Sequence, residues 1–122
     1  MKKRFVCLLF VFVCLLSACS STKFPMSEQH EKYGRKALEI VDAYLDFDIT
    51  IEEAESKLDA LRKAESTLPE STEKEKNGNN FVTADVSNLY FNFNLAKFKG
   101  DFTINVLDQR NNLAELLGES PR

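Results

Sequence analysis

Residues 81–98, FVTADVSNLYFNFNLAKF, decide the fold class, because they can be interpreted as a helix or as part of a hairpin and each interpretation gives a different architecture. One set of apolar residues recurs at spacings of 4, 3, 4 and 3 residues, as on one face of a helix: Val82, Val86, Leu89, Phe93 and Ala96. Another set alternates as in a strand: Leu89, Phe91, Phe93 and Leu95. The alternation fails at Ser87 and Lys97, so we expect a helix over 82–98. A hairpin over 89–106 is the alternative.

A helix start follows the Asp46 to Thr50 segment. Thr50 and Glu53 have the spacing of a capping box, and Ile49 with Ala54 has that of a hydrophobic staple. The apolar residues that follow keep one helical face as far as Ala64, so a second helix is predicted over 51–66. The same segment does not fit an EF-hand calcium loop, because the glycine and the closing glutamate that such a loop needs are absent at the required positions.

Two further helices complete the predicted fold. Ser27 is a suitable N-cap for a helix over 28–46, in which Tyr33, Ala37 and Val41 lie on one face. The last helix is predicted over 103–117, and Gly118 follows it at the position where helices often end. Its apolar side is expected to consist of Ile104, Leu107, Ala114 and Leu117. Asn111 falls inside the stripe, where a buried or half-buried asparagine could cap a neighbouring loop.

These elements predict an all-α protein, a small antiparallel four-helix bundle over residues 28–122. The alternative fold is α+β, with the hairpin at 89–106 packed on two helices. Residues 69–80 contain no apolar side chain and many turn formers, so we expect an exposed loop between the second and third helices.

The N-terminus has the three parts of an export signal. Lys2, Lys3 and Arg4 precede an apolar run over 5–16, and the run closes on Leu16-Ser17-Ala18-Cys19. A membrane-spanning helix needs about 20 apolar residues, and this run is shorter. An ordinary secretory signal cut at Ser17-Ala18-Cys19 is a second alternative, but neither alternative accounts for the cysteine at the boundary.

Leu16-Ser17-Ala18-Cys19 resembles the lipobox of bacterial lipoprotein precursors at all four positions. The resemblance implies diacylglyceryl transfer to the Cys19 thiol, cleavage after Ala18 and N-acylation of the new amino group. Residues 1–18 would then be a signal peptide and 19–27 a tether. Ser20 rather than aspartate permits outer-membrane sorting, facing the periplasm, in a diderm. In a monoderm the domain would lie on the outer face of the plasma membrane.

Cleavage would change the charge and the cysteine content of the chain. Removing three basic residues from the 16 in the chain leaves 13 against 19 acidic ones, a formal charge of −6. Such a chain lacks the basic surface that nucleic-acid binding requires. Cys7 and Cys14 leave with the signal and Cys19 is acylated, so the mature domain is expected to have no free thiol.

The sequence contains no recognisable catalytic or metal site. Its four glycines form no phosphate-binding loop, and no nucleophile elbow is present. His30 is the only histidine, and we expect it to be a solvated surface group rather than a ligand. We therefore predict no catalytic residue, no metal ligand and no cofactor beyond the lipid on Cys19, and we predict that the protein is not an enzyme.

The mature domain also resembles small helical domains of bacterial surface lipoproteins. The residues that carry this resemblance are Ile49-Thr50-Ile51-Glu52-Glu53-Ala54 and Arg110-Asn111-Asn112-Leu113-Ala114. No activity is implied by it. The first functional hypothesis is a lipid-anchored, non-enzymatic binding or structural module with a protein partner in the envelope, its binding residues unknown. The alternative is a small-ligand receptor or enzyme accessory subunit with an aromatic-lined pocket over 81–102.

Overall fold

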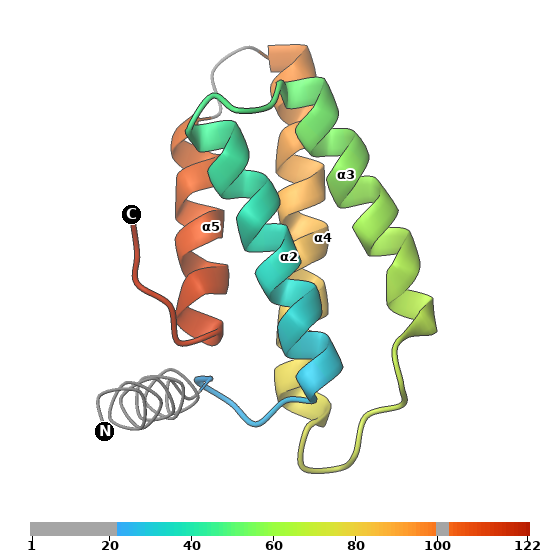
Figure 1. Ribbon diagram of the computed structural model, residues 1–122. Helices are drawn as coiled ribbons and strands as arrows, with labels where there is room; N and C mark the ends of the chain where they lie inside the picture. Colours follow the sequence, from blue (N-terminus) through green and yellow to red (C-terminus); the bar gives the residue numbers. More distant parts are fainter. Residues whose placement is uncertain (1–21, 100–102) are drawn as a thin grey trace, which may run out of the picture.

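Four helices account for most of the computed structural model, which describes residues 22–99 and 103–122. They are α2 (Glu28–Leu45), α3 (Ile51–Ala64), α4 (Lys76–Lys99) and α5 (Thr103–Leu116), and a 3-10 turn, η1 (Glu65–Thr67), extends α3. The helices run alternately up and down, and residues 22–27 lie at the lower end of the bundle in Figure 1. The described residues contain no strand, so the all-α prediction is confirmed and the hairpin alternative is wrong.

The predicted helix ends are formed by the expected residues. The Ser27 side chain accepts a hydrogen bond from the His30 amide, and the Thr50 side chain accepts one from the Glu53 amide. Gly118 has a φ of 75°, and the Glu119 amide donates to the Ala114 carbonyl at 2.8 Å, which completes a Schellman motif after α5. Phe47 has the equivalent position after α2, with a φ of 61°, although it is not a glycine.

The third helix begins earlier than the sequence predicts. α4 starts at Lys76 rather than at residue 82, so the predicted exposed loop over 69–80 is wrong for its last five residues. Gly78 and Asn79 in this added turn are buried. Turn-forming residues are helical here because other segments pack on them, and local propensity does not anticipate such contacts.

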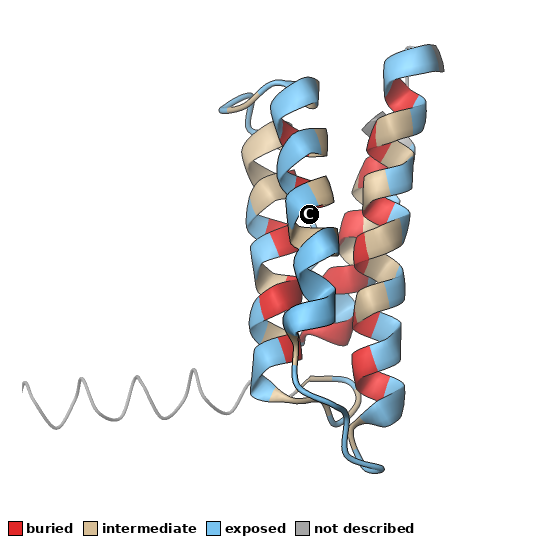
Figure 2. Ribbon diagram, turned by 90° about the vertical axis from the view of Figure 1, so that its right-hand side faces the viewer, coloured by how far each residue is buried: buried red, intermediate tan, exposed pale blue. Residues whose placement is uncertain are grey.

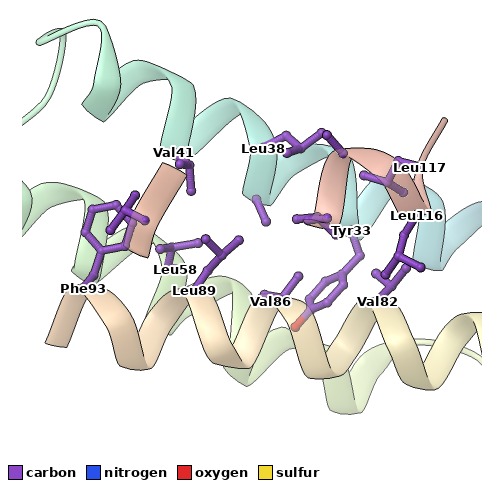
Figure 3. Close-up of a cluster of buried hydrophobic side chains, with 14 of the residues drawn as sticks. Tyr33, Leu38, Val41, Leu58, Val82, Val86, Leu89, Phe93, Leu116 and Leu117 are labelled. Carbon is purple, nitrogen blue, oxygen red and sulfur yellow. The ribbon is translucent and has the colours of Figure 1, made fainter. Parts of the chain in front are cut away.

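The core lies along the axis of the bundle (Figure 3), and Figure 2 shows the buried residues gathered where the helices face one another. All five residues of the predicted α4 stripe, from Val82 to Ala96, are buried. Phe93 is fully buried and meets the Tyr44 ring edge-on, with the ring centroids 4.9 Å apart.

The buried face of α5 is shifted from the predicted one. Ala114 and Leu117 are buried as predicted. Val106 and Leu113 are buried as well, whereas Leu107 is only half-buried. The side chain of Ile104 lies outside the described residues. The prediction for Leu107 was wrong because the helix turns a neighbouring stripe toward the bundle, and Arg110 is part of that stripe.

Candidate functional surfaces

The N-terminal segment 22–27, which the sequence assigns to the tether, packs on the lower end of the bundle. The Lys23 amide donates to the Leu116 carbonyl at 2.9 Å, and the Phe24 and Met26 side chains pack against the core. Gly78 makes this packing possible, because a Cβ there would overlap the Pro25 carbonyl oxygen. Only residues 20 and 21 separate Cys19 from the first described residue.

Asn79 joins this segment to α4. Its Oδ1 accepts a hydrogen bond from the Ser27 amide at 2.9 Å, and its Nδ2 donates to Ser71 Oγ at 2.8 Å. Asn79 is 1% exposed, whereas its partner Ser71 is exposed, so both hydrogen bonds are partly buried. The N-terminal segment, the loop before α4 and the first turn of α4 are therefore held by one buried amide.

His30 is buried, so the prediction of a solvated histidine was wrong. It is 5% exposed, and its Nδ1 lies 2.6 Å from Ser27 Oγ. Burial lowers the pKa of His30, and the nearby Glu65 and Glu75 partly oppose this effect. The neutral imidazole suits a position in the first turn of α2, where the helix dipole disfavours positive charge.

A cleft of about 350 Å³ lies beside the docked N-terminal segment. Phe24 and Phe81 form one part of its wall, with ring centroids 5.0 Å apart. Asp85 and Glu115 also line the cleft. Burial raises the pKa of Asp85, and Glu115 pairs with Lys23 at 2.8 Å. The cleft thus combines an aromatic pair with carboxylates.

A second cleft, of about 220 Å³, has a charged network in its wall. Arg110 is buried, and its Nε and Nη2 donate to the two carboxylate oxygens of Asp42 at 2.9 and 3.2 Å. Burial opposes ionisation of Asp42, but hydrogen bonds from Arg110 and Arg122 outweigh it and lower the pKa of that carboxyl. Asn111 is half-buried, as predicted, and bonds the backbone of Arg122 at 3.0 and 3.2 Å. These contacts hold the C-terminal segment on the bundle.

An apolar groove of about 240 Å³ lies between α2 and α3 and includes Tyr33. The tyrosine is 4% exposed, and its hydroxyl has no hydrogen-bond partner among the described residues. Burial and the nearby Glu65 raise the pKa of Tyr33 to about 12. Tyr33 therefore carries a buried polar atom without a hydrogen-bond partner, which costs stability.

The outer face of α4 carries an exposed line of residues, which we call the outer stripe. Its members share a spacing of 4, 3, 4 and 3 residues and all are exposed: Ala84, Asn88, Phe91, Leu95 and Phe98. Phe91, Leu95 and Phe98 are 52%, 47% and 82% exposed. Apolar side chains at this spacing are typical of a helix face that packs against another element.

The sites predicted from sequence are only partly within the described residues. Cys19, the predicted lipidation site, lies outside them, as does the rest of the lipobox. The described residues contain no group of three or more potential metal ligands. No helix among them has the length and apolar character that crossing a membrane requires.

Comparisons with known proteins provide no assignment. No family model matches the chain, and neither the curated proteins nor the solved structures include a match.

Sequence reasoning missed the outer stripe and the buried Asn79. The outer stripe is visible in the sequence, because Phe91 and Leu95 belong to the alternating apolar set that also fits a strand. No local signal marks Asn79, because its partners Ser27 and Ser71 come from other segments.

Proposed function

We propose that the protein is a lipid-anchored component of the bacterial cell envelope and that its bundle is a non-enzymatic binding or structural module. The lipobox Leu16 to Cys19 supports the anchor. The outer stripe of α4 supports the binding role, because three large apolar side chains on one helix face are exposed. This exposed surface is the observation on which the binding role rests.

The docked N-terminal segment adds a constraint on where the bundle lies. If Cys19 carries the lipid, residues 20 and 21 reach about 10 Å between Cys19 and Thr22, even when fully extended. The lower end of the bundle is then held close to the bilayer. The domain faces the periplasm from the outer membrane of a diderm, or lies outside the plasma membrane of a monoderm.

The anchor is tested by labelling cells with a palmitate analogue. The wild-type protein should be labelled and should fractionate with membranes, and Cys19→Ala should lose both properties. An unlabelled protein that is nevertheless cut after Ala18 would identify an ordinary secretory signal.

The binding role is tested by cross-linking in the intact envelope. We expect the wild-type protein to form cross-linked products that are lost when Phe91 and Leu95 are both replaced by serine. Phe47→Ser is a matched control, because Phe47 is 93% exposed but lies in the α2–α3 connection. Equal cross-linking of all three proteins would argue against the outer stripe. A defined turnover of an envelope substrate by the soluble Cys19→Ala chain would contradict the non-enzymatic role.

The cleft beside Phe24 and Phe81 favours a second candidate function, a small-ligand receptor or enzyme accessory subunit. Lys23 also lines the cleft, where it pairs with Glu115 and lies 5.9 Å from the Phe24 ring centroid. Asp85 and the Phe81 ring are therefore the groups left for an organic cation. Benzylamine and benzoate are probes of similar shape and opposite charge. A receptor of this kind should be stabilised by benzylamine alone, and Phe81→Ala should remove the effect. Equal or absent stabilisation by the two probes would eliminate this candidate.

A further inference from the structure

We propose that the outer stripe of α4 binds the same stripe of a second copy of this chain, with the two α4 helices parallel. This inference rests on the proposed lipid anchor. The spacing of the stripe is that of a heptad repeat, with Ala84 and Phe91 at d positions and Leu95 at an a position. The opposite face of α4 is already used by the core.

Asn88 has the a position between Ala84 and Phe91 in the same heptad repeat, and it is exposed. An asparagine at an a position meets its counterpart in a parallel two-stranded pair, where it fixes the register at some cost in stability. Asn88 would otherwise be an unexplained polar interruption between the apolar members of the stripe. In a second copy paired in parallel and in register, the Asn88 amide lies at the same level along the helix axis and can pair with its counterpart.

The charge pattern also favours a second copy. Residues 86–96 contain no charged side chain, although 29% of the chain is charged. A strongly charged partner would find no counter-charge along this surface. An identical surface introduces no charge repulsion at the contact itself, and the net negative charges elsewhere are screened beyond about 8–10 Å.

The direction of α4 selects the parallel arrangement. The N-terminal segment packs against Gly78 and Asn79 at the start of α4, and Figure 1 shows it at the lower end of the bundle. At 1.5 Å per residue, Phe91 lies about 20 Å farther along the helix axis. Parallel helices place both tethers at one end, as two anchors in one membrane require. Antiparallel helices would place the tethers at opposite ends.

The size of the stripe explains why the anchor matters. Taking about 200 Å² for a fully exposed side chain of this size, Phe91, Leu95 and Phe98 expose on the order of 350 Å². Two such surfaces bury roughly 700 Å², which is below the ~1,200 Å² of most stable complexes. The pairing is therefore weak in solution, and confinement of both copies to one membrane raises their effective concentration.

Disulfide cross-linking of the full-length, acylated protein in its own membranes tests the proposal. The mature protein has no other free thiol if Cys19 is acylated, so Ala84→Cys and Leu95→Cys each introduce a single reactive group. Both variants should shift to twice the monomer mass on mild oxidation. Lys57→Cys, on the exposed surface of α3, is the control and should remain monomeric.

Cysteines at two positions are tested in order to distinguish parallel from antiparallel pairing. Residues 84 and 95 lie about 16 Å apart along the helix. Only a parallel pair brings both positions to their own counterparts, so cross-linking at one alone overturns the proposal. Adding Phe91→Glu to Ala84→Cys should abolish the dimer, because two carboxylates would then face each other. Persistence of that dimer also overturns it.

The failure of the pairing and the failure of the anchor are distinguishable in the same sample. Acylated protein that cross-links no more than Lys57→Cys overturns the pairing and leaves the anchor intact. Absence of the acyl label overturns the anchor, and the pairing with it. The soluble chain 20–122 should be monomeric at micromolar concentration, and a stable soluble dimer through another surface would contradict the mechanism.

Discussion

Replacing Gly78 with alanine tests whether the docked N-terminal segment is part of the folded domain. Alanine at an ordinary helical position stabilises a helix by about 1 kcal/mol relative to glycine. At Gly78 the added Cβ would overlap the Pro25 carbonyl oxygen, which belongs to the backbone and cannot rotate away. The N-terminal segment must therefore move away from α4.

The loss can be estimated from the contacts of that segment. Displacement breaks the Ser27 to Asn79 hydrogen bond and leaves a buried amide unsatisfied, at a cost of about 1–3 kcal/mol. Partial exposure of Phe24 and Met26 costs about 1 kcal/mol each, since both are only half-buried now. After the gain in helix propensity, we expect Gly78→Ala to destabilise the domain by about 2–4 kcal/mol.

Urea unfolding of residues 20–122 measures this difference, and Gly34→Ala is the matched control. A Cβ at Gly34 would lie 3.1 Å from the Leu117 and Val82 side chains, so they must move by a few tenths of an ångström, but it would overlap no backbone atom. Gly34→Ala should therefore stay within about 1 kcal/mol of the wild type. If Gly78→Ala is as stable as the wild type, the docking of the N-terminal segment contributes nothing and the reasoning fails.

Three other outcomes are expected on the same chain. Tyr33→Phe should raise the free energy of unfolding by about 1 kcal/mol, because it removes a buried hydroxyl without a partner, and a loss of stability would contradict this. The pKa of folded His30 lies below its ordinary value of 6.5, so the unfolded chain binds the proton first as the pH falls. Stability should be full well above pH 6.5 and should decline as the pH falls through 6.5 toward the lower pKa of the folded state, and a melting temperature that stays flat as the pH falls below 6.5 would refute it. Arg110→Ala should cost about 2–3 kcal/mol in urea unfolding because it leaves Asp42 without its buried partner, whereas Lys63→Ala, on an exposed pair, should cost less than about 0.5 kcal/mol.

Features that depend on a few neighbouring residues were predicted correctly from the sequence. Ser27 and Thr50 cap their helices, Gly118 ends α5, and the stripe from Val82 to Ala96 faces the core. Each signal depends on residues within one or a few turns of the same helix. The packing of the bundle requires no departure from these local preferences, so the predicted caps, helix end and core stripe are all present in the folded chain.

Features that depend on distant segments were not predicted. The Lys76 to Asn80 turn has weak helix formers, and Asn79 is helical beside Ser27, which is 52 residues away. His30 follows a serine cap in a polar sequence, yet it is buried. Arg110 appears in the sequence analysis only within the motif Arg110-Asn111-Asn112-Leu113-Ala114, and its burial depends on Asp42 from another helix. A single sequence contains no local mark of such contacts.

The ambiguity of residues 81–98 and the outer stripe have one physical cause. Residues two apart lie about 200° apart around a helix, so an alternating apolar sequence that folds as a helix places its members on opposite faces. Leu89 and Phe93 accordingly face the core, and Phe91 and Leu95 face outward. The outer stripe is the core stripe displaced by two residues, with the same spacing of 4, 3, 4 and 3. A helix that only covered one core would need a single apolar face, so the strand-like alternation in this sequence is itself an indication that α4 has a second packing partner.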